Sequence, residues 1–200
     1  NDGYLLQYVL RAGVEAYGIE PTGSTARAAR NKGIDIVEAF FGEHLARQLA
    51  AAGRQGDLIV ANNVLAHVPN INDFLRGFTR LLKRKGVATF EFPHLLEMIL
   101  GNQFDTVYHE HFSYLSLITV KRIFEVNGLI IFDVEKLSTH GGSLRVFAQR
   151  RDYGTTAISP MVAKLLSEEE AAGVSNISFY QTFQRNAEKI KDELLAYLSN

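Results

Sequence analysis

The sequence predicts an α/β protein with a wound, mostly parallel sheet that ends in an antiparallel strand pair and is followed by a C-terminal helical segment. Helical and strand patterns alternate through the first two thirds of the chain, with short turns between them, as in wound sheets. Two further strand patterns, over 129–137 and 143–150, are joined by a Thr-His-Gly-Gly turn. That link is too short for a parallel crossover, so we expect this pair to be antiparallel.

Short helices and strands alternate at the start of the chain. Gly13 and Gly33 stop the first two helices, and Ser24 caps the second one. The expected order is helix 4–12, strand 15–20, helix 25–31, strand 34–37 and helix 43–52.

The central elements are longer. Residues 57–61 (Asp-Leu-Ile-Val-Ala) form an apolar run typical of a buried strand. Helix 72–85 has its large apolar residues on one face and basic residues at its end, where the helix dipole favours them. Strand 87–92 and helix 119–127 precede the antiparallel pair.

The chain closes with an expected long amphipathic helix after Pro160. Its apolar residues recur at helical spacing. They are Ile177, Tyr180, Phe183, Ala187, Ile190, Leu194 and Leu198.

Composition excludes several classes of function. The 21 basic and 22 acidic residues leave a formal net charge of −1, which gives no electrostatic reason to expect nucleic acid or an anionic membrane as partner. The absence of cysteine excludes disulfides and Cys-ligated metal within these residues. No apolar run approaches the roughly 20 residues of a membrane helix, so the expected location is the cytoplasm.

The start of the chain does not fit a complete wound sheet, which should begin with a strand. Here the sequence begins on a turn and a helix. We therefore expect a first strand and the start of its glycine loop to precede Asn1. The expected domains are 1–155, and a helical extension or linker over 156–200.

Asp2, Gly3 and Glu20 form the first candidate site. A glycine turn, a helix and a strand ending in an acidic residue bind adenosine cofactors in wound sheets, because glycine lets the backbone approach the ligand and the carboxylate accepts the ribose hydroxyls. The spacing from Gly3 to Glu20 is suitable. An ordinary turn and an ordinary strand-end glutamate are the alternative.

Asn62 and Asn63 follow the apolar strand 57–61, where open α/β sheets place their ligands. Their amides can donate and accept hydrogen bonds without adding charge. Turn formation is the alternative reading of this pair. His67, four residues later, is by position alone a capping or packing histidine.

Tyr108-His109-Glu110-His111 is the densest group of titratable side chains. Ligands so close in sequence, without a fourth partner, make a poor zinc set, and a solvated polar loop is another alternative. The functional reading is acid–base chemistry by histidine, with Glu110 fixing the ring tautomer and Tyr108 donating to an oxyanion.

The turn between the last two strands is the fourth candidate. Paired glycines between strands most often form only a turn. Here they are flanked by polar residues that suit a phosphate or a sugar hydroxyl. The candidate substrate residues are His140, Gly142, Ser143 and Arg145.

Together these segments resemble the S-adenosylmethionine-dependent C-methyltransferases that act on nucleotide-linked deoxysugars. The resemblance runs in order through about 1–150. It is carried by NDGYLL, YGIEPT, NNVLAHVPN, FEFPH, YHEHFSYLS and DVEKLSTHGGSLRVF. It implies a Rossmann-like class I methyltransferase fold and a place in deoxysugar biosynthesis. It further implies a preceding zinc-binding domain and a following Rossmann-like domain, and both domains are expected partners of this chain. Zinc is therefore expected only in the missing N-terminal domain.

The resemblance also implies residue roles. Glu20 would bind the cofactor ribose, Asp2 and Gly3 would line its methionine and ribose, and Phe40 or Phe41 would pack near the adenine. Asn62 and Asn63 would border both cofactor and sugar. His111 would be the catalytic base, surrounded by Tyr108, Glu110 and His67.

The implied substrate is a nucleotide (TDP)-linked 4-keto-6-deoxysugar that is methylated at C3. His111 would remove the C3 proton, and Tyr108 or His67 would stabilise the enolate oxygen. Two alternatives stay open. One is an O- or N-methyltransferase of the same fold that acts on a small molecule. The other is a non-catalytic nucleotide- or cofactor-binding domain.

Overall fold

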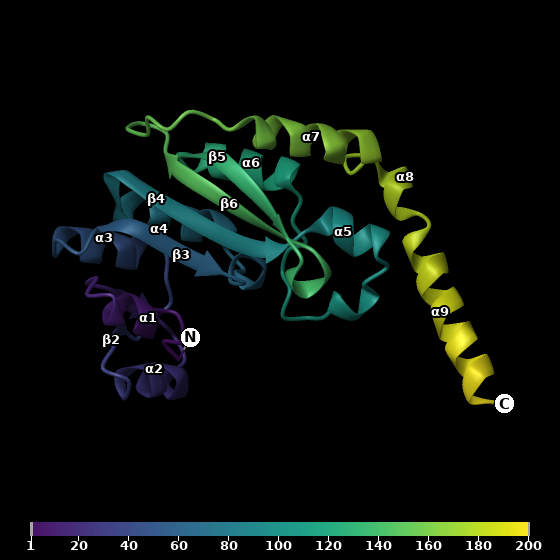
Figure 1. The fold of residues 1–200 in the computed structure, drawn as a ribbon, viewed down its shortest axis with the longest axis horizontal. Coiled ribbons are helices and arrows are strands. Elements are labelled where there is room, and N and C mark those ends of the chain that lie inside the picture. Colours follow the sequence, from purple (N-terminus) through teal and green to yellow (C-terminus); the bar gives the residue numbers. More distant parts are fainter. Residues whose placement is uncertain (1, 200) are drawn as a thin grey trace. The chain divides into compact units, whose positions relative to one another are not determined.

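The structure is a computed structural model that describes residues 2–199, and it has the predicted α/β architecture with a mixed, mostly parallel arrangement of strands (Figure 1). The chain divides into two units. The first comprises residues 1–55 and 73–81, and the second comprises residues 56–72 and 82–200.

The first unit is built on two short parallel strands, β1 (Tyr17–Ile19) and β2 (Asp35–Val37). Its core is small and apolar. It comprises Ala26, Ala29, Ile34 and Ile36, with Leu6 and Leu10 packed against them. The helices of this unit are α1 (Leu6–Arg11), α2 (Gly23–Arg30), α3 (Glu43–Ala51) and most of α4 (Ile71–Leu81).

An ion-pair cluster joins α3 to α4. Glu43, in the first turn of α3, accepts from Arg47 at 2.6 Å, from Arg76 at 2.8 Å and from Arg80 at 3.2 Å. These three guanidinium groups, Arg47 first, hold the pKa of the Glu43 carboxyl at about 2, well below its usual 4.5. Phe41 packs edge-on against Phe74 of α4.

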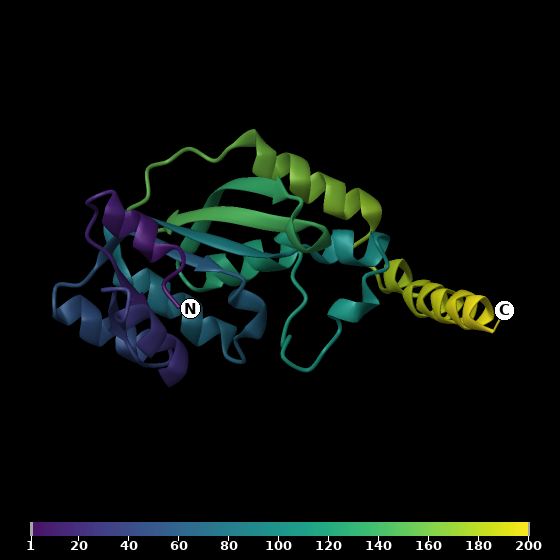
Figure 2. The same ribbon diagram turned by 60° about the horizontal axis from the view of Figure 1, so that its bottom comes forward.

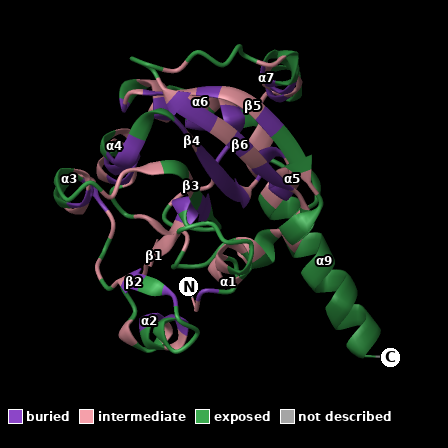
Figure 3. Cartoon of the chain, turned by 60° about the vertical axis from the view of Figure 1, so that its left-hand side comes forward, coloured by how far each residue is buried: buried purple, intermediate pink, exposed green. Residues whose placement is uncertain are grey.

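The second unit contains a four-stranded sheet in the order β3-β4-β6-β5. Its strands are β3 (Gly56–Asn62), β4 (Leu82–Pro93), β5 (Leu129–Leu137) and β6 (Ser143–Arg150). The β3–β4 pair is parallel, whereas β6 runs antiparallel to both of its neighbours. Buried residues concentrate on β4 and β6 (Figure 3), where Phe90, Leu144 and Val146 are fully enclosed.

Helices complete this unit. Two of them, α6 (Leu117–Val126) and α7 (Pro160–Ala172), pack against β5 and against each other. Four short helical segments lie in the connections between the strands and the longer helices. They are the 3-10 helices η1 (Leu65–His67), η2 (Phe104–Thr106) and η3 (Thr139–Gly141) and the α-helix α5 (Leu95–Leu100). The last helices are α8 (Ile177–Tyr180) and α9 (Phe183–Leu198), and α9 extends away from the sheet of its unit (Figure 2).

The antiparallel strand pair is confirmed with the predicted bounds, 129–137 and 143–150. The predicted helix 72–85 is too long, because Leu82 pairs with Gly56 of β3 and the chain continues from there as β4. Lys83 accordingly pairs with Asp57 of β3 at 2.6 Å.

Other local expectations need correction. The N-cap of α2 is Thr22 rather than Ser24, which lies inside the first turn. The long closing helix is interrupted between α8 and α9. Helix α7 lies within the predicted helical extension, whereas α5 is a helix that the sequence pattern did not indicate. The expected single sheet is present as two sheets within the described residues. In residues 2–199, no helix combines the length and the apolar character needed to cross a bilayer.

We expect Glu43 to make the stability of the protein sensitive to acid. Because its folded pKa of about 2 lies below its usual 4.5, its contribution is complete above pH 4.5 and is lost as the pH falls towards 2. Glu43→Gln should lower the free energy of unfolding at neutral pH and flatten its decline between those two pH values, as measured by urea unfolding. Glu15→Gln, an exposed control in the same unit, should leave the wild-type curve unchanged. An unchanged acid slope in Glu43→Gln would contradict the assignment.

Candidate active site

Three of the predicted catalytic residues gather in the second unit. Tyr108 and His111 lie on the segment after η2, and their rings are 4.2 Å apart between centroids. His67, from η1, has its ring 4.7 Å from that of His111. Tyr108 is 43% exposed, and the two histidines are partly exposed, so the group is open to a ligand.

The hydrogen bonds of His111 define its tautomer. Nδ1 lies 2.9 Å from the carbonyl oxygen of Thr106, which can only accept, so Nδ1 carries the proton. Nε2 lies 3.0 Å from the Tyr108 hydroxyl, which therefore donates to the ring. In its neutral form, His111 therefore has its basic nitrogen at Nε2, which faces the Tyr108 hydroxyl. This is the form that a general base requires.

His67 and its turn hold the other side of this segment. The His67 Nδ1–H donates to the carbonyl oxygen of Glu110 at 3.1 Å, and the Ala66 carbonyl accepts from the backbone N–H of Phe112 at 2.9 Å. Glu110 therefore enters the group through its main chain. The Thr106 carbonyl, and not the Glu110 side chain, lies at Nδ1 of His111, and a catalytic role for Glu110 stays a prediction.

Asn62 and Asn63 lie at the carboxyl end of β3, as predicted. Asn63 has a positive φ of 53°, a conformation that asparagine tolerates better than most residues, and its N–H donates to the Glu91 carbonyl at 2.7 Å. Asn62 pairs with Glu91 in the sheet register. Both residues are exposed, so the structure is compatible with the turn reading and with the ligand reading.

The turn between β5 and β6 is shaped by three positive φ angles, 52° at His140, 73° at Gly141 and 124° at Gly142. A Cβ on Gly142 would lie 2.7 Å from the Cβ of Glu97, so only glycine fits there. Ser143 is 1% exposed and donates to the Thr139 carbonyl at 2.9 Å. The hydroxyl is therefore buried and supports the turn, and a role for Ser143 at the substrate stays a prediction.

Arg145 is engaged by two carboxylates. Its guanidinium lies 2.8 Å from the Glu91 carboxylate and 3.5 Å from that of Glu135. Thr139 donates to the other Glu91 oxygen at 3.3 Å. Glu91 is 6% exposed, so Arg145 neutralises a buried charge on the central strand. Sequence reasoning missed Glu91, although an acidic residue inside the apolar run Phe-Glu-Phe was a usable signal.

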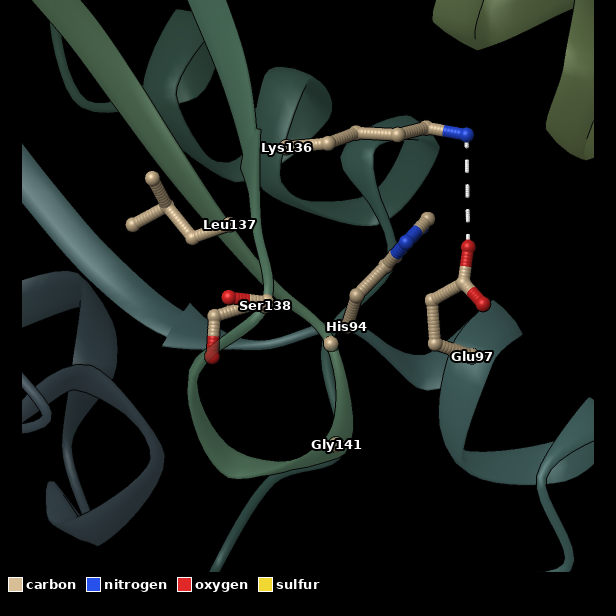
Figure 4. Close-up of a pocket in the computed structure, with 8 residues that line it drawn as sticks. His94, Glu97, Lys136, Leu137, Ser138 and Gly141 are labelled. Carbon is tan, nitrogen blue, oxygen red and sulfur yellow. Dashed lines mark ion pairs between the residues drawn. The ribbon is translucent and has the colours of Figure 1, made fainter.

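A pocket of about 400 Å³ lies between this turn and α5 (Figure 4). Lys136 reaches across it towards Glu97, 3.9 Å away. The pocket is lined by His94, Glu97, Lys136, Leu137, Ser138, Gly141, Gly142 and Ser143. Two of the predicted substrate residues, Gly142 and Ser143, thus border a real cavity.

The predicted adenosine-binding residues lie in the first unit. Glu20 follows β1, and Phe40 follows β2 three residues after that strand ends. The Glu20 N–H donates to the Val37 carbonyl at 3.0 Å, so the two strand ends lie together. Phe40 is 84% exposed, whereas Phe41 packs on α4, which favours Phe40 for any contact with a ligand.

Asp2 and Gly3 have clear structural partners. Asp2 pairs with Lys32 at 2.5 Å, and the hydrogen bond from Lys32 lowers the pKa of the Asp2 carboxyl. Gly3 has a φ of 80°, and a Cβ there would lie 2.0 Å from Cδ1 of Ile34. Packing alone therefore requires glycine at this position, and a role in cofactor binding stays a prediction.

Comparisons with known proteins give a consistent result. A family described as "Methyltransferase domain" matches residues 1–133, and one described as "C-methyltransferase C-terminal domain" matches residues 138–200. The chain is 32% identical to C-methyltransferase NovU of Streptomyces niveus over 194 residues. That match covers 97% of this chain and 46% of the relative, so the chain spans about half of the relative's length.

Solved structures share the fold at low identity. The PH0226 protein of Pyrococcus horikoshii OT3 is 14% identical with a TM-score of 0.60, and the match covers 74% of this chain and 77% of that one. Magnesium protoporphyrin IX methyltransferase of Synechocystis PCC 6803, solved with bound S-adenosylhomocysteine, is 17% identical with a TM-score of 0.56. Its match covers 74% of this chain and 70% of that one.

The tautomer of His111 can be tested directly. We expect nitrogen chemical shifts of labelled protein at mildly alkaline pH to show His111 protonated at Nδ1 and unprotonated at Nε2, because the Thr106 carbonyl accepts only from a proton on Nδ1. Tyr108→Phe should shift the Nε2 resonance and leave the Nδ1 proton in place. A ring protonated at Nε2 would refute this description of the site.

Proposed function

This chain belongs to the family of methyltransferase domains, and on that basis we propose that it transfers a methyl group from S-adenosylmethionine to C3 of a nucleotide-linked 4-keto-6-deoxysugar, with His111 as the base. The observation that carries the proposal is the placement of the His111 ring, whose Nδ1 is bound to the Thr106 carbonyl and whose Nε2 is held beside the Tyr108 hydroxyl. The similarity to a relative named as a C-methyltransferase supports carbon as the acceptor.

Methyl transfer to carbon requires steps that transfer to oxygen does not. The C4 ketone acidifies the hydrogen on C3, and His111 Nε2 accepts this proton as the C3–H electron pair becomes an enolate. The enolate carbon then forms a bond to the methyl group. S-adenosylmethionine supplies that methyl on a sulfonium, and the electron pair of the broken bond stays on sulfur.

The other residues of the group suit the enolate. Its oxygen carries the developing negative charge, and a donor held in place stabilises it. The Tyr108 hydroxyl can turn from His111 to this oxygen with little movement, because it lies 3.0 Å from the nitrogen that receives the proton. His67 is the second candidate donor, since its ring lies 4.7 Å from that of His111.

The first unit fits the adenosine part of the cofactor by its chemistry. Glu20 places a carboxylate at the carboxyl end of β1, and Phe40 presents an exposed ring beyond the neighbouring β2. A carboxylate accepts hydrogen bonds from both ribose hydroxyls, and an exposed aromatic face suits a purine. We assign the ribose to Glu20 and the adenine to Phe40.

The substrate side involves the turn between β5 and β6. We propose that His140 and Gly142 border the sugar nucleotide, next to the cavity that Lys136 and Glu97 line. Arg145 contributes by holding Glu91, and its partly exposed guanidinium also suits a phosphate.

We expect His111→Asn in the complete protein to lower kcat by at least about a hundredfold, the lower range for loss of a general base. Deuterium uptake at C3 of the keto sugar in deuterated water should fall in parallel, because the same nitrogen removes this proton. His109→Asn, an exposed neighbouring histidine, is the matched control and should retain both activities. A methylated product that keeps the C3 hydrogen would indicate O- or N-methylation instead.

Binding of the cofactor product tests the first unit separately. Titration calorimetry with S-adenosylhomocysteine should give micromolar affinity for the complete protein, weakened about ten- to a hundredfold in Glu20→Ala, as expected for lost hydrogen bonds to a charged group. Glu15→Ala should bind as the wild type does. Equal affinity in Glu20→Ala would remove Glu20 from the site, and absence of binding to the wild type would overturn the methyltransferase proposal.

A further inference from the structure

Glu169 of α7 is a buried carboxylate that accepts three hydrogen bonds. Its side chain is 0% exposed. Oε1 lies 2.7 Å from Nε2 of His94 and 2.6 Å from the backbone nitrogen of Leu117, and Oε2 lies 2.8 Å from the backbone nitrogen of Ile118. None of these groups belongs to the set of residues already assigned to catalysis or binding.

The three donors lie at the two ends of one chain segment. His94 directly follows β4, and Leu117 begins α6. The segment between them contains Tyr108 and His111. Its two ends also meet through a backbone hydrogen bond from Leu95 to Leu115 at 2.9 Å. Glu169 therefore joins the entry and the exit of the segment that carries the proposed base.

We propose that Glu169 is a positioning residue, which clamps the segment 94–117 and so fixes Tyr108 and His111 for the reaction. The inference rests on the proposed function for its catalytic consequence. The effect of Glu169 on the order of this segment can be measured by amide hydrogen exchange without a substrate.

The groups around Glu169 are hydrogen-bond donors, which suits an acceptor at this position. Leu117 and Ile118 open α6, so their N–H groups are the first unpaired donors of that helix, and its dipole favours a negative charge there. His94 is 1% exposed, and its Nδ1 has no hydrogen-bond partner in the described part of the chain. A proton on Nδ1 would have no acceptor there, so the His94 ring donates to Glu169 through Nε2.

The clamp connects two regions that match different families. Glu169 lies within residues 138–200, which match the C-methyltransferase C-terminal domain, while the clamped segment lies within residues 1–133, which match the general methyltransferase domain. In this proposal the C-terminal region holds the ends of the segment that carries the proposed base, and it contributes no reacting group itself. Val162 and Leu165, both buried, anchor α7 so that this carboxylate is held in place.

The test compares Glu169→Gln with Glu170→Gln in the complete protein. Gln keeps the volume of Glu169 but replaces one acceptor oxygen with a donor, whereas Glu170 is exposed on the same helix and serves as the matched control. We expect Glu169→Gln to lower kcat at least tenfold, with less than a twofold change in KM for S-adenosylmethionine. Amide hydrogen exchange over 95–118 should accelerate at least tenfold, while exchange in β4 and β6 stays as in the wild type. Glu170→Gln should change neither quantity.

Three results would overturn the inference. The first is amide exchange over 95–118 in Glu169→Gln that equals that of the wild type. The second is accelerated exchange over 95–118 with an unchanged kcat. The third is accelerated exchange throughout β4 and β6 as well, because it would mean that Glu169 has a purely structural role. Glu169→Asp keeps the charge with a shorter reach, so it should give intermediate values and replaces the Gln variant if that protein fails to fold. If the wild-type protein methylates no keto sugar, the proposed function fails, and the exchange comparison then decides on the clamp alone.

Discussion

Burial of the Glu91 carboxylate on β4 is the constraint that orders the site-bearing edge of the second unit. A charge that is 6% exposed must be paired, and Arg145 of the adjacent β6 pairs with it at 2.8 Å. The pairing works only in the observed antiparallel register, which sets Glu91 opposite Arg145. On its other side, Glu91 pairs with Asn62 of the parallel β3, and its carbonyl fixes the left-handed Asn63. The residue with this one buried carboxylate thus contacts both the end of β3 and the start of β6, next to the β5–β6 turn.

The strongly periodic elements could be predicted from the sequence, whereas those that depend on distant partners could not. Strands 129–137 and 143–150 carry their own alternation and a turn with two glycines, and both were predicted with the observed bounds. The end of α4 was not, because residues 82–85 continue an acceptable helical pattern and only the pairing of Leu82 with Gly56 turns them into a strand. The region of α7 was predicted only as part of a helical extension or linker, because Glu169 occupies one of its buried positions and interrupts the apolar stripe.

In the site, too, contacts between residues that are close in the sequence could be predicted, whereas contacts that depend on distant partners or on the main chain could not. Tyr108 and His111 lie three residues apart, so their interaction could be read from one segment. The group that orients the ring could not, because it is the main-chain carbonyl of Thr106, which every residue type offers equally. His94 and Glu169 are separated by 75 positions, and neither suggests the other without the fold.

The choice of a carbonyl rather than a carboxylate at His111 Nδ1 bears on the chemistry. After proton transfer the ring is an imidazolium, and a carboxylate partner would stabilise it strongly by charge, as in the Ser-His-Asp arrangement. The Thr106 carbonyl instead fixes the tautomer through a dipole and leaves the positive charge of the ring uncompensated by that partner. In the proposed reaction this charge forms beside a developing enolate, which is its natural counter-charge. In that proposed reaction the imidazolium would pair with the enolate and so stabilise the intermediate. The nearby Tyr108 hydroxyl would donate a further hydrogen bond to the enolate oxygen.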